Sequence, residues 1–180
     1  MDLGILADID SGAYKFTKVL HLLSVIAGLG VTFWYGVYGA RAKKMGQGGD
    51  AMGSAGVADA NFFVGSTAEK VIATIPVFGV ALVFMSDDAW GFDQTWVWLS
   101  LTLFAIAFAL ANLVLLPLSR RMSELSRELA SMGPPPAGAS GPPPQVAQMD
   151  AVGKRLGAIS GVLHLLLITI LTLMIWKPGV

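Results

Sequence analysis

The chain has 180 residues, of which 54% are hydrophobic and only 13% charged, and its twelve basic residues balance twelve acidic ones. Soluble domains carry about 25% charged residues, so this composition is too apolar for a dispersed soluble globule. It also excludes a nucleic-acid partner bound through a basic surface. The sequence contains no cysteine, which excludes disulfides, thiolate catalysis and cysteine-bound metals.

Apart from a proline-rich stretch at 129–149, four long windows of the sequence are free of charged residues. A membrane-spanning helix needs about 20 mostly apolar residues, and three windows reach this length directly. The window that begins at Val71 reaches it if its helix begins near Thr67, where Ser66 and Glu69 have the spacing of a capping box. We therefore predict an all-α, four-helix transmembrane bundle in a single membrane domain, 1–180. The expected helices are about 14–40, 67–86, 95–119 and 156–176.

Two segments between these helices look like flexible cytoplasmic loops. Residues 42–66 are rich in glycine and alanine, and residues 130–150 contain the run PPPAGASGPPP. Residues 118–129 place Leu118, Met122 and Leu125 on one helical face opposite charged residues. This pattern predicts either an extension of the third helix or a short interfacial helix.

The basic residues are distributed unevenly around the four windows. Nine of the twelve lie in the segments that follow the first and third helices, whereas the segment between the second and third helices has none. The positive-inside rule places those nine in the cytoplasm. We therefore expect both termini outside and a multi-pass protein of a bacterial cytoplasmic (inner) membrane. The nine residues are Arg41, Lys43, Lys44, Lys70, Arg120, Arg121, Arg127, Lys154 and Arg155.

Small residues recur at every fourth position in the first and fourth helices, a spacing that lets helices approach closely in lipid. They can pack the bundle itself, or a partner helix from a second copy or another membrane protein. Asn112 in the third helix is expected to face inward and to hydrogen-bond between helices. The predicted packing residues are Ser24, Gly28, Thr32, Gly36, Gly153, Gly157, Gly161 and Asn112.

The only two histidines of the chain, His21 and His164, both fall within predicted spans. Each lies seven residues from a glycine of the small-residue stripes (Gly28 and Gly157), so each is expected to point along a packed face. A titratable residue at membrane depth is by default a functional candidate. The alternative interpretation is that both are neutral histidines hydrogen-bonded between helices.

Imidazole nitrogens are axial ligands of b-type haem. The depth of each histidine in the membrane determines whether both could bind the same iron. His21 lies roughly 5–9 Å from the outer boundary and His164 roughly 20 Å from it, at about 1.5 Å per residue. One iron does not easily bridge two ligands with such an offset. Ligation by His21 alone is therefore preferred, and His164 is the less favoured candidate.

Several short motifs resemble a family of bacterial predicted integral membrane proteins of unknown function, over nearly the whole chain. They are Tyr14–His21, Thr74–Pro76, Trp96, Arg120–Arg121 and Ile175–Gly179. That family looks distantly similar to HemJ-type protoporphyrinogen oxidases and to copper-resistance D proteins. HemJ proteins share the Lys-x-x-His pattern, here Lys18 to His21, and the resemblance implies that His21 holds haem. HemJ proteins also carry a lysine within the bundle, which the later helices here lack.

The sequence predicts a haem- or porphyrin-associated redox protein with His21 as axial ligand. The alternative is a non-catalytic subunit or assembly factor of a membrane complex, because few chemical groups lie within the spans. Solute transport is less favoured, since no charged residue marks a pathway. No motif for a protein-bound metal or for nucleotide or hydrolase chemistry is present, and no catalytic residue is assigned.

Overall fold

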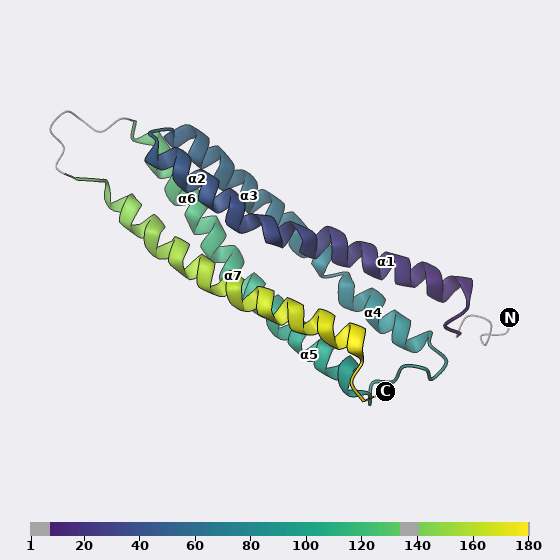
Figure 1. Cartoon of the computed structure of the whole chain (residues 1–180). Coiled ribbons are helices and arrows are strands. Elements are labelled where there is room, and N and C mark those ends of the chain that lie inside the picture. Colours follow the sequence, from purple (N-terminus) through teal and green to yellow (C-terminus); the bar gives the residue numbers. More distant parts are fainter. Residues whose placement is uncertain (1–7, 134–140, 180) are drawn as a thin grey trace. The chain divides into compact units, whose positions relative to one another are not determined.

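A computed structural model describes residues 8–133 and 141–179, and every regular element in these ranges is helical (Figure 1). This confirms the all-α prediction. The elements in chain order are α1 (Gly12–Leu29), η2 (Gly30–Trp34), α2 (Tyr35–Gln47), α3 (Ala51–Ile72), α4 (Ile75–Phe84), α5 (Thr95–Leu110), η3 (Ala111–Leu115), α6 (Leu116–Ser131) and α7 (Pro144–Trp176).

The described ranges contain four helical stretches that are long and apolar enough to cross a membrane, which confirms the predicted number of spans. Each has 33 to 37 residues, or about 50–55 Å at about 1.5 Å per residue. The hydrocarbon core of a bilayer is about 30 Å thick, so part of each helix extends beyond it. The four stretches are Gly12–Gln47, Ala51–Phe84, Thr95–Ser131 and Pro144–Trp176.

The segment 42–66 is helical rather than a flexible loop, so this expectation is corrected. Only a tight turn at Gly48–Asp50 separates α2 from α3. Gly49 adopts the left-handed conformation (φ +87°), which glycine tolerates. Asp50 caps α3, because its carboxylate accepts a hydrogen bond from the Gly53 amide at 2.8 Å. The alanines that follow favour a helix over a loop.

The expected start of the second helix near Thr67 is also corrected. The hydroxyls of Ser66 and Thr67 both donate to the Phe63 carbonyl, at 2.9 and 3.0 Å, inside the continuous helix α3. Ser66 therefore satisfies a local carbonyl and does not cap a helix N-terminus. Charge-free windows mark the part of a helix that suits lipid, whereas the helix itself continues into water.

The segment 130–150 is helical at both of its ends. α6 continues to Ser131 and α7 begins at Pro144, a residue that suits the first helical position because it lacks an N–H. The remaining part of the predicted linker, 134–140, lies outside the described residues. Of the two alternatives for residues 118–129, the structure has an extension of the third helix, since α5, η3 and α6 are continuous.

Prolines explain two interruptions of the helical stretches. Pro76 lies at the first turn of α4, and its ring is incompatible with a regular turn on the carbonyl of Ile72, so α3 ends there. Before Pro117, residues 111–115 form a π-helical turn. This wider turn accommodates the proline that lacks an amide hydrogen.

Contacts divide the chain into two compact units. The described part of the first unit comprises residues 8–30, 68–109 and 163–179. The second comprises residues 31–67, 110–133 and 141–162. Both units are helical, and helices α3 and α7 each contribute a segment to both.

In the first unit, α1 packs against the break between α3 and α4. A Cβ atom on Gly28 would lie 2.8 Å from Ile72 Cγ1 and 3.2 Å from the Ile72 backbone nitrogen. Nearby, Thr74 Oγ1 lies 3.0 Å from Ser24 Oγ, whose own hydroxyl donates to the Leu20 carbonyl. Gly28 and Ser24 therefore allow the two backbones to approach closely.

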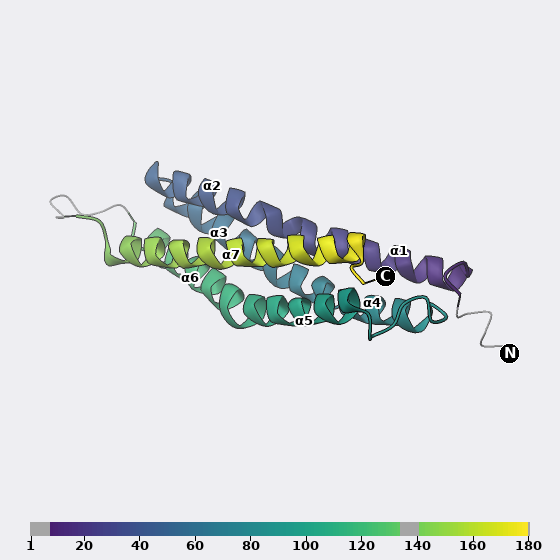
Figure 2. The ribbon, with the colours of Figure 1, turned by 60° about the horizontal axis from the view of Figure 1, so that its bottom comes forward.

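Aromatic residues join the ends of three helices of the first unit. The Trp90 indole donates to the Tyr14 hydroxyl at 3.1 Å and packs edge-to-face with Trp96 at 5.6 Å between ring centroids. The ammonium of Lys177 lies 3.5 Å from the Trp90 ring centroid and 5.4 Å from that of Trp96. These contacts hold the C-terminal end of α7 beside the start of α5 (Figure 2).

In the second unit, polar contacts connect α3 with α6. Asp59 forms an ion pair with Arg127 and accepts a hydrogen bond from Ser123 at 3.1 Å. Beside them Leu125 is fully buried. Lys43 of α2 pairs with Asp150 of α7 at 2.9 Å. This unit combines a buried apolar residue with exposed ion pairs.

Candidate functional site

His21 is anchored to the second span by a hydrogen bond. It lies in the third turn of α1 and is 8% exposed. Its Nδ1 is 3.0 Å from the carbonyl oxygen of Ile75, the residue that precedes Pro76. The interruption between α3 and α4 therefore places the first turn of α4 beside His21 of α1.

The hydrogen bond defines the tautomer of a neutral His21. A carbonyl oxygen only accepts, so Nδ1 must carry the proton and donate it to Ile75. Nε2 then carries the lone pair. A histidine whose Nδ1–H is held by a backbone carbonyl while Nε2 is left as a base is the usual arrangement of a metal-ligating imidazole.

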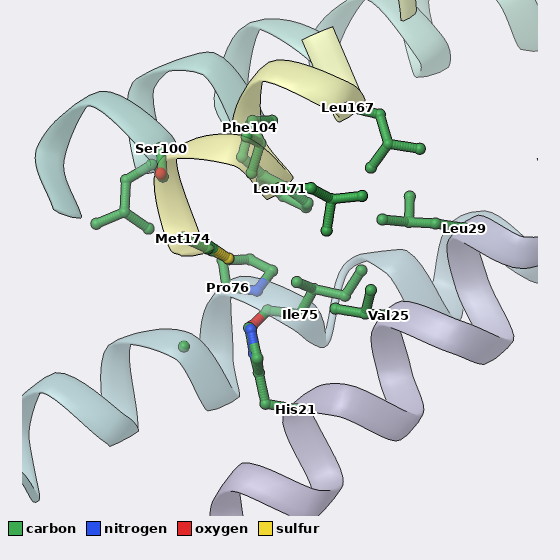
Figure 3. Close-up of a pocket in the computed structure, with 13 residues that line it drawn as sticks. His21, Val25, Leu29, Ile75, Pro76, Ser100, Phe104, Leu167, Leu171 and Met174 are labelled. Carbon is green, nitrogen blue, oxygen red and sulfur yellow. The ribbon is translucent and has the colours of Figure 1, made fainter. Parts of the chain in front are cut away.

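His21 lines a cavity inside the first unit, shown in Figure 3. Residues from α1, α4, α5 and α7 contribute to its wall, so all four spans enclose it. The cavity has a volume of about 70 Å³ and is partly open. Its apolar wall includes Val25, Leu29, Leu101, Phe104, Leu167 and Leu171.

A glycine makes room for the His21 ring. A Cβ atom on Gly79 of α4 would lie 3.2 Å from Cε1 and 3.6 Å from Nδ1 of His21. The 3.2 Å contact is tighter than normal packing, so a larger residue at position 79 would displace the imidazole. Gly79 therefore belongs to the site as a positioning residue, and the sequence analysis did not select it.

Two further residues of the cavity carry side-chain heteroatoms. Ser100 of α5 is 2% exposed, and its hydroxyl has no hydrogen-bond partner among residues 8–133 and 141–179. Met174 of α7 contributes a thioether. Neither was selected from the sequence, because a single serine or methionine in an apolar helix is ordinary; only the fold brings them to His21.

The structure does not bring His164 to this cavity. His164 lies on α7 in the same unit as His21, but it is absent from the cavity wall. The described chain also contains no group of three or more His, Asp or Glu side chains suited to a metal ion. His21 is therefore the one imidazole of the cavity.

The predicted packing residues differ in their surroundings. Ser24 and Gly28 lie at the close contact of α1 described above, and a Cβ atom on Gly153 would lie 3.6 Å from the methyl group of Met122. Thr32 lies in η2 and Asn112 in the π-helical turn η3. At three further positions a Cβ atom would meet nothing within 4 Å among the described residues, so packing there stays a prediction. These are Gly36, Gly157 and Gly161.

A comparison with protein families found one match, over residues 15–178. The family is described as "Predicted integral membrane protein (DUF2269)". The chain belongs to the DUF2269 family. No curated protein and no solved structure matched the chain. Family membership and the four apolar helices together establish an integral membrane protein, while the resemblance to HemJ-type and copper-resistance D proteins stays a hypothesis.

Proposed function

We propose that this protein is a haem-binding redox protein of the bacterial cytoplasmic membrane and that His21 is an axial ligand of the haem. The observation that carries the proposal is the hydrogen bond from His21 Nδ1 to the Ile75 carbonyl, 3.0 Å long, at the wall of an apolar cavity. It orients the imidazole and leaves Nε2 as the donor atom that haem iron requires.

The donor set and the wall of the cavity suit a porphyrin. Apart from His21, Ser100 and Met174, the side chains that line the cavity are hydrocarbon, which matches the apolar faces of a macrocycle. The cavity itself has a volume of about 70 Å³, so uptake of a porphyrin would require the surrounding helices to move apart.

The chain's own residues would perform three tasks. His21 binds the iron through Nε2, the Ile75 carbonyl increases the basicity of the imidazole, and the apolar wall excludes water. Haem, when bound, supplies one-electron redox chemistry. The positive-inside distribution of charge favours an orientation with both termini outside. In that orientation His21, three residues after Lys18, would lie near the outer side of the membrane.

Absorption spectroscopy tests this proposal. The protein would be purified in detergent after expression with added haem, and spectra would be recorded in the oxidised and reduced states. We expect a Soret band in the wild-type protein, its loss in His21→Ala, and its retention in the matched control His164→Ala. Added imidazole should restore the band in His21→Ala, which separates loss of a ligand from loss of the fold.

A wild-type protein that takes up no haem, or a His21→Ala variant with an unchanged spectrum, would overturn the proposal. The first result would favour the other function considered, a non-catalytic subunit or assembly factor of a membrane complex. Co-purification of a second membrane protein in detergent would then be the decisive measurement for that alternative.

A further inference from the structure

We propose that Lys18 and Lys177 bind the phosphate group of an anionic phospholipid at the end of the first unit where α1 begins and α7 ends. Neither lysine lines the cavity of His21, so this site is independent of the proposed haem function. The inference rests on the contacts that bring the two lysines to one aromatic cluster, on their charge and on the apolar side chains beside them.

Three aromatic side chains, Tyr14, Trp90 and Trp96, form this aromatic cluster. Lys18 Nζ lies 5.5 Å from the centroid of the Tyr14 ring. The Tyr14 hydroxyl accepts a hydrogen bond from the Trp90 indole at 3.1 Å. Lys177 Nζ lies 3.5 Å from the centroid of the Trp90 ring, and all five residues belong to the first unit. Two ammonium groups from opposite ends of the sequence therefore contact one aromatic cluster.

The positive charges of the two lysines are not balanced by carboxylates. Neither Lys18 nor Lys177 forms an ion pair with any residue of 8–133 and 141–179. In contrast, Lys15, on the same helix as Lys18, pairs with Asp10 at 3.3 Å. Lys177 is half-buried, and its pKa is lowered from the usual value by burial and then by the positive charge of Lys18. A bound anion would offset both effects, because it attracts the two ammonium groups and replaces water that Lys177 has lost.

The ammonium of Lys177 can bind an anion without leaving the aromatic cluster. It has three N–H donors, and the ring faces of Trp90 and Trp96, at 3.5 and 5.4 Å, attract its charge. The rings do not provide the oxygen lone pairs that these N–H groups bind best, so a phosphate oxygen is a suitable additional partner. The backbone of Lys177 is left-handed (φ +44°), which is uncommon for a residue other than glycine. An uncommon conformation thus occurs at the residue whose ammonium lies on the cluster.

The surroundings of the two lysines favour a lipid over a free phosphate ion. The fourth span ends at residue 176, so Lys177 directly follows it. Lysine and tryptophan side chains at the end of a span lie at the level of the lipid headgroups. Exposed apolar side chains, which suit acyl chains, flank both lysines in the sequence: they are Phe16, Val19, Ile175 and Trp176. A free phosphate ion would use none of these apolar contacts.

The test measures lipid binding by the delipidated full chain in detergent. Dissociation constants would be obtained from the rise in Tm with ligand concentration. The probes are phosphatidylglycerol, phosphatidylcholine with the same acyl chains but no net charge, and inorganic phosphate. We expect the wild type to bind phosphatidylglycerol most tightly, and Lys18→Gln and Lys177→Gln each to weaken this binding about fivefold. Lys15→Gln is the matched control and should bind like the wild type, because Lys15 already pairs with Asp10.

Several results would overturn the proposal. Equal affinities of the wild type, Lys18→Gln and Lys177→Gln for phosphatidylglycerol would remove the two lysines from the site. Equal affinity of the wild type for phosphatidylcholine would exclude recognition of net charge, and equal affinity for inorganic phosphate would exclude the lipid as its source. If Lys177→Gln does not fold, Lys177→Arg keeps the charge. Retained binding in Lys177→Arg with weakened binding in Lys18→Gln then supports the proposal, and unchanged binding in Lys18→Gln contradicts it.

Discussion

Gly28 provides the sharpest test of the packing in the first unit. In Gly28→Ala the new Cβ would lie 2.8 Å from Ile72 Cγ1 and 3.2 Å from the Ile72 nitrogen, so the α1 and α3 backbones must move apart. Overpacking of this kind costs about 1–3 kcal/mol. The higher helix propensity of alanine returns about 1 kcal/mol. We expect Gly28→Ala to lower the free energy of unfolding by about 0–2 kcal/mol.

Gly157→Ala is the matched control, because a Cβ atom there meets nothing within 4 Å. It should gain up to about 1 kcal/mol from propensity alone, so the two variants should differ by about 1–3 kcal/mol. The assay is reversible denaturation in mixed detergent micelles. Ile72→Ala combined with Gly28→Ala should cost less than the sum of the single changes, since it removes the clashing atom. Equal stabilities of Gly28→Ala and Gly157→Ala would refute the close contact.

Two further predictions concern the cavity and the aromatic contact of Lys177. Ser100→Ala removes a buried hydroxyl that has no hydrogen-bond partner in the described residues. The haem-free protein should therefore become more stable by about 1 kcal/mol, which would be measured as a higher Tm. A lower Tm would show that the hydroxyl does have a hydrogen-bond partner. The pKa of Lys177 is lowered from its usual value of 10.5, mainly by burial and to a smaller extent by the positive charge of Lys18. The face of the Trp90 ring acts in the opposite direction, because it favours the ammonium form. The unfolded chain then binds this proton more tightly than the folded chain, so stability should rise with pH between the lowered pKa and 10.5. The Tm of Lys177→Met should not show this rise. Parallel profiles of Tm against pH for wild type and Lys177→Met would contradict the pKa shift.

The number of spans could be predicted from the sequence because lipid tolerates few charges. Only four uncharged windows are apolar enough to form spanning helices. The helix ends could not be predicted in the same way. Residues 42–66 looked flexible because of their glycines, yet Gly49 and Asp50 form a short turn between two helices. Those two residues, a left-handed glycine followed by a capping aspartate, were the available signal.

The candidate site was predictable only in part. His21 stands out in the sequence because a histidine within an apolar span is rare. Gly79, Ser100 and Met174 are ordinary residues for a membrane helix, and they become part of a site only because α4, α5 and α7 meet at His21. Helical periodicity placed His164 on a glycine face, but periodicity does not say which neighbouring helix covers that face.

The continuity of α7 has a mechanical consequence. Its 33 residues form an uninterrupted α-helix, whereas the other three spans contain a 3₁₀ segment at 30–34, a break at 73–74 or a π-helical turn at 111–115. A break in the hydrogen-bond ladder is where a helix bends at least cost. Bending should therefore cost more in α7, whose hydrogen-bond ladder is unbroken, than in the other three spans.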